Sequence, residues 1–271
     1  MSVTVPAAAR PPSVSSELPA PGFTDLLRSE WTKIRTVRTT LLCLLSLITP
    51  VLGVATLIAL DKEPPGPHPI AWVVNVSHFG LLVGQLAVVV FAVTAIGSEY
   101  GTGLIRTSLA AVPWRGRWLV AKALVVAVLT LVAGGLLSVA AFAVVHSTTP
   151  DVAGSVLEPG VIRAVLGSGL YLSGLAVLSL AVGALVRNTA GGIAAMFALI
   201  FVVPVIVAAS PLIRLGRFLP VGSGPPSSGW AITQLGPMLG GLTPWAGFAV
   251  LCAWAGLAMA GAVHLLRVRD A

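Results

Sequence analysis

Charged residues are scarce in this chain. Only 9% of its 271 residues are Asp, Glu, Lys or Arg, whereas 56% are hydrophobic. Soluble domains carry about 25% charged residues, so this sequence cannot give a soluble fold its usual polar surface. The mean hydropathy of +0.98 supports the same conclusion. We therefore expect an integral membrane protein.

Several catalytic and binding motifs are also missing. The sequence has no G-x-x-x-x-G-K-[ST] loop, so we expect no ATP site of the P-loop type in this chain. It has no H-E-x-x-H motif and no Cys/His cluster, so we expect no metal site. Cys43 and Cys252 both fall in apolar runs, which indicates packing roles instead of a disulfide framework. The chain is predicted to hold no cofactor and to have no catalytic site.

Six apolar runs are long enough to cross a bilayer, which takes about 20 residues as a helix. The predicted fold is an all-α membrane protein with six transmembrane helices. Pro50 and Pro204 are expected to kink the first and fifth spans, because proline removes a backbone donor. Small residues four apart, such as Ser179 and Gly183, predict close helix packing. The predicted spans are 39–60, 76–97, 118–145, 161–186, 190–210 and 244–266.

The basic residues gather on alternate connections between these runs. Eleven of the 16 Lys and Arg residues lie before the first span, between spans two and three, between spans four and five, or after the last, and a twelfth, Lys122, lies just inside span three. By the positive-inside rule this places both termini in the cytoplasm. The net charge of +7 then reflects topology and anionic lipid, and we expect no nucleic-acid partner. The composition favours a bacterial plasma membrane protein.

Two domains are predicted from the change in composition near residue 22. Residues 1–22 are rich in Pro, Ala and Ser and are expected to form a disordered cytoplasmic tail. Residues 23–271 form the six-span domain, which begins with an amphipathic helix over 23–38 suited to the membrane interface. The apolar residues at helical spacing in this helix are Phe23, Leu27, Trp31, Ile34 and Val37.

The connection between the fifth and sixth spans, Pro211 to Pro244, is about 30 residues of mostly uncharged Gly- and Pro-rich sequence. We expect it to dip back into the membrane edge on the external side as a re-entrant segment. Irregular backbone at that depth must be buried in protein or line a wet cavity.

The middles of all six spans contain no Asp, Glu, Lys or Arg. Ionisable groups at mid-depth usually mark proton or ion pathways, so an ion-coupled secondary transporter is the alternative that the sequence favours less. An intramembrane serine protease is less favoured again. Its candidate residues, Ser168, Ser173, Ser179 and His264, lack a nucleophile context and fit helix–helix hydrogen bonding better.

The connection SEYGTGLIRTSLAAVPWRGRWLVAK, from Ser98 to Lys122, holds most of the remaining polar residues. Thr102 is expected to cap a short helix that runs to about Ala111 and is ended by Pro113. One interpretation is an ordinary positive-inside loop with snorkelling cations. A short stiff helix between two spans is also what a soluble motor could push against.

These residues carry a resemblance. Four segments resemble the permease subunits of the type-2 ABC exporter family: LRSEWTKIRTVR before the first span, Ser98–Lys122, LVRNTAGGIAA between spans four and five, and the last 30 residues. Together the segments extend over most of the chain after residue 23. The resemblance implies a membrane subunit that exports a lipophilic or amphipathic substrate, with ATP and Mg bound by a separate ATP-binding-cassette ATPase.

The resemblance also implies partners and sites. A second permease copy would complete the pathway as a homo- or heterodimer, and an external re-entrant hairpin would lie between spans five and six. The N-terminal amphipathic helix and the first cytoplasmic loop would contact the ATPase. The matching positions in this sequence are Glu30, Lys33, Glu99, Thr102, Arg106, Pro113 and Arg115.

Overall fold

The computed structural model describes residues 22–60, 69–105, 115–148, 160–211, 213–220, 229–234 and 242–268. Within these ranges the chain is helical and has no strand. Six helical segments are long and apolar enough to span a membrane, which confirms the predicted number. They are α2 (Arg38–Ala59), Ile70–Thr102 formed by α3 and α4, α6 (Arg115–Thr148), α7 (Val161–Val186), Thr189–Ala208 formed by α8, η1 and α9, and α10 (Pro244–Val268).

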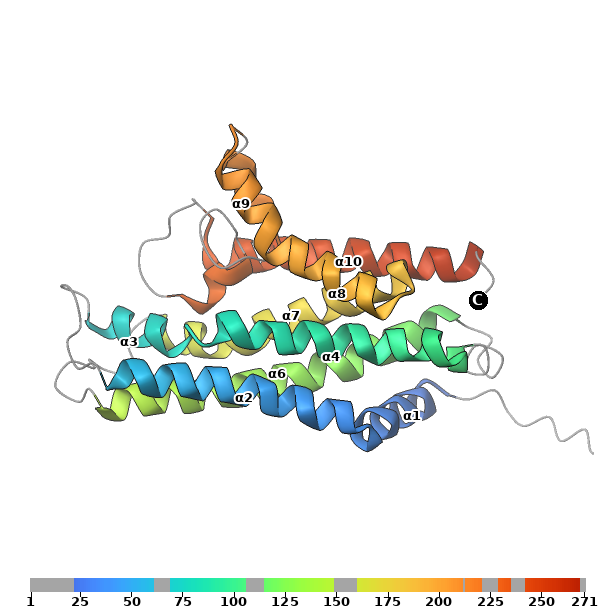
Figure 1. Cartoon of the computed structure of the whole chain (residues 1–271), viewed down its shortest axis with the longest axis horizontal. Coiled ribbons are helices and arrows are strands. Elements are labelled where there is room, and N and C mark those ends of the chain that lie inside the picture. Colours follow the sequence, from blue (N-terminus) through green and yellow to red (C-terminus); the bar gives the residue numbers. More distant parts are fainter. Residues whose placement is uncertain are drawn as a thin grey trace, which may run out of the picture.

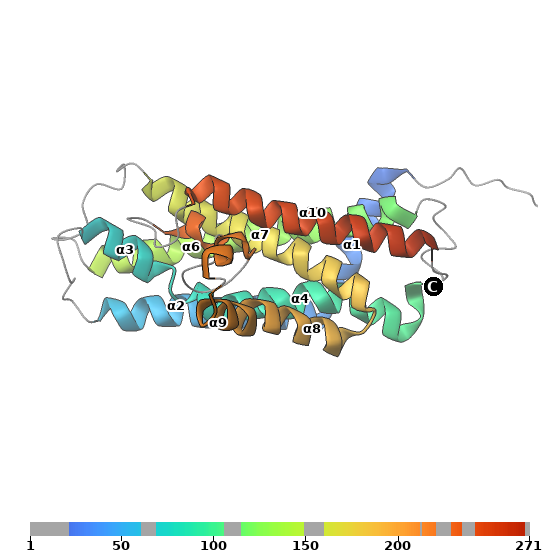
Figure 2. The ribbon, with the colours of Figure 1, turned by 90° about the horizontal axis from the view of Figure 1, so that it is seen from above.

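The helices form a bundle elongated along one axis. Figures 1 and 2 show α2, α4, α6, α7 and α10 running along this axis, with the short α1 (Phe23–Thr36) set at one end. At 34 residues, α6 is about 50 Å long, from a rise of 1.5 Å per residue. It therefore extends beyond a hydrocarbon core of about 30 Å.

The centre of the bundle is α7, which packs against α4, α6, α8 and α10. Its closest approach is to α6, where a Cβ atom added to Gly169 would lie 2.7 Å from the Leu131 carbonyl oxygen. Gly134 and Gly135 of α6 lie at the same crossing, so the small residues there allow the two backbones to meet as predicted. Gly256, in contrast, has open space around it.

The second span is longer than predicted and is interrupted. The helix α3 (Pro69–Ser77) ends before a turn at residues 78–80, and α4 (Leu81–Thr102) continues from it. A Cβ atom on Gly80 would lie 2.4 Å from the Pro50 carbonyl oxygen, so α2 packs directly on the backbone of this turn. The prediction of 76–97 missed this break, because glycine at a tight crossing looks like any small residue in an apolar run. Thr102 ends α4, and its hydroxyl donates to the Ser98 carbonyl at 2.8 Å, so its predicted role as an N-terminal cap is wrong.

The fifth span is also divided. It begins with α8 (Thr189–Phe197), which the Asn188 side chain caps by accepting from the Gly191 amide at 2.9 Å. A π-helical turn, η1 (Ala198–Val202), then leads into α9 (Val203–Ala208), with Pro204 in its first turn. A wider turn accommodates a proline that cannot donate to the residue four positions earlier. Figure 1 shows α9 tilted away from the other helices.

The connection from α9 to α10 contains two short 3₁₀ helices in its described part, η2 (Ile213–Phe218) and η3 (Gly229–Thr233). The second lies against α7 and α10. Arg163 of α7 donates to the Ile232 and Gln234 carbonyls at 3.0 and 2.9 Å, and Ile232 is fully buried. This part of the connection is therefore fixed to the bundle.

Candidate functional site: a buried charge network at the basic end

Most described cations lie at one end of the bundle, which we call the basic end: Lys33, Arg115, Arg117, Lys122, Arg187 and Arg267. The helix ends meet there, since Arg115 Nη1 donates to the Leu266 carbonyl at 2.9 Å and Arg187 Nη2 donates to the Leu265 carbonyl at 3.4 Å. Arg163 and Arg217 lie elsewhere, at the start of α7 and in η2. The predicted segregation of basic residues is therefore present in three dimensions.

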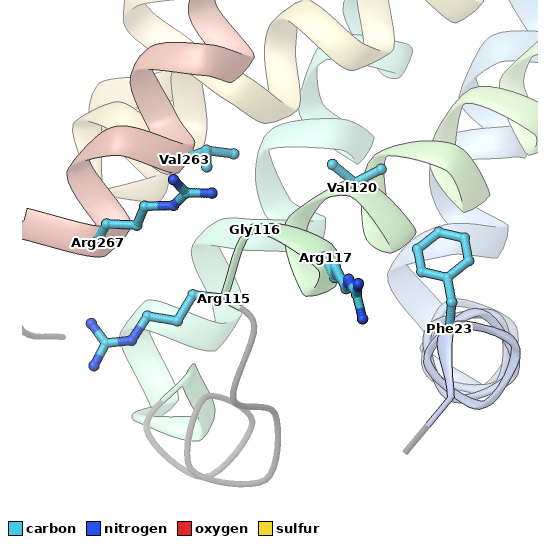
Figure 3. Close-up of a pocket in the computed structure, with 7 residues that line it drawn as sticks. All are labelled: Phe23, Arg115, Gly116, Arg117, Val120, Val263 and Arg267. Atoms are coloured by element: carbon cyan, nitrogen blue, oxygen red, sulfur yellow. The ribbon is translucent and has the colours of Figure 1, made fainter. Parts of the chain in front are cut away.

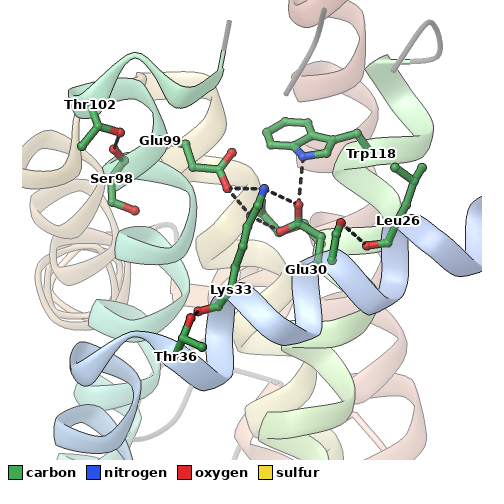
Figure 4. Close-up of polar contacts among 10 residues, drawn as sticks. Leu26, Glu30, Lys33, Thr36, Ser98, Glu99, Thr102 and Trp118 are labelled. Atoms are coloured by element: carbon green, nitrogen blue, oxygen red, sulfur yellow. Dashed lines mark hydrogen bonds and ion pairs between the residues drawn. The ribbon is translucent and has the colours of Figure 1, made fainter. Parts of the chain in front are cut away.

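Four charged side chains from three helices meet inside this end (Figure 4). Lys122 of α6 donates to Glu30 Oε2 of α1 and, at 2.8 Å, to Glu99 Oε1 of α4. Lys33 of α1 donates to Glu30 Oε1 at 2.7 Å and to Glu99 Oε1 at 3.2 Å. The two carboxylates and two ammonium groups balance in charge. We call Glu30, Lys33, Glu99 and Lys122 the charge network.

Three of the four members of the network are removed from solvent. Glu30 and Lys122 are each 1% exposed and Glu99 is 5% exposed, whereas the Lys33 side chain is 41% exposed. Trp118 covers it from α6, with its indole Nε1 donating to Glu30 Oε1 at 3.1 Å and its ring 5.4 Å from Lys122 Nζ. Charges buried this deeply are tolerated only when they are paired and hydrogen-bonded.

The electrostatics of α1 follow from this pairing. Burial disfavours the charged form of Glu30, but the positive charge of Lys122 and the hydrogen bonds from both lysines outweigh burial and lower the pKa of Glu30. Burial likewise opposes the charged form of Lys33, while its hydrogen bond and attraction to Glu30 and its attraction to Glu99 raise its pKa. Both groups are therefore charged near neutral pH.

Local sequence explains how the helices present these groups. The first turn of α1 is closed by the Gly22 amide, which donates to Asp25 Oδ2 at 3.0 Å. Leu26, Glu30 and Ile34 then recur every fourth residue and form the buried face of α1. Of the predicted apolar face, Ile34 belongs to this buried face, whereas Phe23, Trp31 and Val37 are exposed.

One network member, Lys122, and the residue that covers the network, Trp118, were not predicted as site residues. Trp118 and Lys122 are four apart on α6, so they lie on one face of the helix. A lysine after four apolar residues resembles a snorkelling cation at a span edge. Only its pairing with acids from two other helices distinguishes it, and that pairing depends on tertiary structure.

The structure separates the seven predicted ATPase-contact residues into groups. Glu30 and Glu99 point inward and belong to the network, Lys33 is partly exposed at its edge, and Arg115 holds α6 to α10. Thr102 is exposed at the end of α4. Arg106 and Pro113 lie outside the described residues, as does the tail 1–21.

One atom of the network is left without a partner. Glu99 Oε2 is buried and has no hydrogen-bond partner in the described part of the chain. Glu99, Lys33 and Lys122 also line a groove of about 180 Å³ bounded by Thr40 and Phe91. The arrangement holds α1, α4 and α6 together, and no group of three or more His, Cys, Asp or Glu side chains suited to a metal ion occurs among the described residues.

Other polar residues inside the spans are hydrogen-bonded, some to neighbouring helices and some within their own helix, so Ser168 and Ser179 do not make the expected bonds between helices. His78 Nε2 lies 2.6 Å from Ser138 Oγ, which donates to the Val165 carbonyl at 2.8 Å. Tyr171 donates to Gln85 Oε1 at 2.7 Å. The hydroxyls of two of the protease candidates, Ser168 and Ser179, donate to carbonyls one turn earlier in α7.

Comparison with models of known protein families gives no match, and comparison with curated proteins gives no significant match. The functional argument therefore depends on the residues and their geometry.

Proposed function

We propose that this chain is the membrane subunit of a bacterial ATP-binding-cassette exporter and works with a separate ATPase and a second permease copy. The observation that carries the proposal is the charge network, because it ties α1 to both helices that flank the 103–114 connection. An ATPase bound on the cytoplasmic side would contact these two elements, α1 and the connection. A displacement of either would be passed to α4 and α6.

The position of the network supports this role over proton coupling. Glu99 lies three residues from the end of α4 and Lys122 lies seven residues into α6, so both are near the basic end. The sequence of the spans has no Asp, Glu, Lys or Arg at mid-depth, where a proton-coupled carrier would need a titratable group. The full sequence also lacks a P-loop, so energy would come from the partner.

A second observation that supports the proposal is the position of η3 against the bundle. Arg163 fixes η3 to the bundle, and a Cβ atom on Gly167 of α7 would lie 2.6 Å from the Ile232 carbonyl oxygen. Gly167 is in the second turn of α7. An apolar segment held at this depth is what a re-entrant element between spans five and six would require. The apolar bundle favours a lipophilic or amphipathic substrate.

The experiment compares two variants of α1 that remove one positive charge each. Lys33→Gln removes two hydrogen bonds to the network, whereas Arg35→Gln changes an exposed residue elsewhere on the same helix. ATP hydrolysis and uptake of amphipathic dyes are measured in inverted membrane vesicles that contain the ATPase partner.

We expect ATP-dependent uptake with the wild type and with Arg35→Gln, and less uptake per ATP hydrolysed with Lys33→Gln. Equal uptake per ATP in both variants would refute the coupling role of the network. Uptake driven by an ion gradient without ATP would instead support the secondary transporter.

A further inference from the structure

A second feature of the basic end is a cleft between α1, the start of α6 and the end of α10. It encloses about 640 Å³ and is lined by Phe23, Arg115, Gly116, Arg117, Val120, Val263 and Arg267 (Figure 3). Three of the seven lining residues are arginines and none is acidic. The cleft is separate from the charge network, and its role does not depend on the transport proposal.

The three arginines of the cleft differ in their contacts and exposure. Arg115 donates to the Leu266 carbonyl and so fixes the start of α6 against the end of α10. Arg117 and Arg267 are both exposed, and Figure 3 shows Gly116 between their side chains. Arg267 has no hydrogen-bond or ion-pair partner among the described residues. A guanidinium offers a planar fork of donors that matches the oxygens of a phosphate group.

Gly116 lies in the lining of the cleft, where α6 passes close to α10. A Cβ atom on Gly116 would lie 3.2 Å from Val263 Cγ1 and 3.7 Å from Arg267 Nη2. The absence of a side chain at this position therefore lets the start of α6 approach Val263 and Arg267 of α10 closely.

An apolar surface leads away from the cleft along α6. Val120 and Phe23 at its edge are 45% and 40% exposed, although both are large hydrophobic residues. Leu124, Val128 and Val132 follow at intervals of four residues and are also exposed. Residues four apart form a continuous ridge on a helix surface. This ridge begins at the arginines and runs into the membrane-spanning part of α6.

We propose that this cleft binds one anionic phospholipid, with its phosphate between Arg117 and Arg267 and an acyl chain along the ridge from Val120 to Val128. Basic pockets between helices at a membrane surface suit anionic headgroups, and the adjoining apolar ridge suits a lipid better than a soluble phosphate compound. A bound lipid would join α1, α6 and α10 at the basic end.

The test uses the full chain purified in a mild detergent and mixed with phosphatidylglycerol or phosphatidylcholine. Bound lipid is counted by native mass spectrometry. The variant Arg117→Gln/Arg267→Gln removes two charges from the cleft. The control Arg28→Gln/Arg35→Gln removes two charges from exposed positions of α1, which do not line the cleft. Size-exclusion profiles establish that each variant is folded.

We expect the wild type and the control to retain phosphatidylglycerol in preference to phosphatidylcholine. The cleft variant should lose roughly tenfold or more in phosphatidylglycerol binding, as expected for two cations at an anionic surface. Inorganic phosphate at the same concentration should not displace the lipid. Equal losses in both variants, no loss in the cleft variant, or full displacement by phosphate would overturn the proposal. Loss of ATPase co-purification with unchanged lipid binding would instead assign the cleft to an acidic protein partner.

Discussion

Substitution of Glu30 or Lys122 tests the charge network most directly, because these two residues form its most deeply buried ion pair. Glu30→Gln leaves three charged members with a net charge of +1, and Lys122→Met leaves three with a net charge of −1. Removing one partner of a buried pair typically costs 3–5 kcal/mol, because the other charge stays buried without compensation. Both residues are 1% exposed, so we expect each single variant to lose about 3–5 kcal/mol of stability.

The double variant Glu30→Gln/Lys122→Met restores a neutral network, in which Lys33 and Glu99 still pair at 3.2 Å. A buried ion pair replaced by residues of similar volume is often nearly neutral in stability. We therefore expect the double variant to be more stable than the sum of the two single losses predicts, by at least about 2 kcal/mol, within the range for residues in contact. Lys33→Gln provides the comparison, since a half-exposed pair contributes only about 0–1 kcal/mol.

The assay is unfolding of the purified chain in detergent, followed by far-ultraviolet circular dichroism and by the fluorescence of its tryptophans, including Trp118. The free energies of the wild type, the two single variants and the double variant complete a double-mutant cycle. If the stability losses of the two single variants sum to the loss of the double variant within about 0.5 kcal/mol, Glu30 and Lys122 do not interact. The structural argument for the network would then be wrong.

Four further predictions follow from the structure. Gly80→Ala should destabilise the bundle by about 1–3 kcal/mol by overpacking against α2, whereas Gly53→Ala, which meets no atom within 4 Å, should be neutral or slightly stabilising in the same unfolding assay. Arg163→Gln should release η3 and increase proteolysis between α9 and α10, and an unchanged digestion pattern would contradict its anchoring role. Stability should fall as the pH drops below about 4.5, since the lowered pKa of Glu30 means that its contribution is complete above that value and lost as the group protonates; Glu30→Gln should lack this component. At the alkaline side, the raised pKa of Lys33 means that its contribution is complete below about 10.5 and lost as the pH rises further, so melting curves of Lys33→Gln should lack this alkaline component.

Much of the fold could be predicted because the membrane limits the choices. Six apolar runs near 20 residues predict six helices, and the structure confirms that number. Small residues four apart predicted close helix packing, and Gly134 and Gly169 meet at such a crossing. A kink at Pro204 was expected as well, but not the π-helical turn over 198–202 that precedes it. The break at residues 78–80 could not be predicted, because it depends on which helix packs against Gly80.

The candidate site was predicted in part. The resemblance singled out Glu30, Lys33 and Glu99 as positions that would contact an ATPase. The structure turns both carboxylates inward, where they meet Lys122. This inward pairing could not be predicted from the sequence, since Glu99 and Lys122 are 23 residues apart and Glu30 and Lys122 are 92 apart. Three helices must pack before their charges can balance.

The central claim is that ATP hydrolysis by a partner drives this chain through the basic end. The most direct test is magnesium-dependent ATP hydrolysis by the chain purified with its ATPase from native membranes and returned to liposomes. We predict hydrolysis that elutes with the chain and is coupled to dye transport in the wild type, with the coupling reduced in Lys33→Gln. Transport by the chain alone, driven by a proton gradient and without hydrolysis at any step, would contradict the claim.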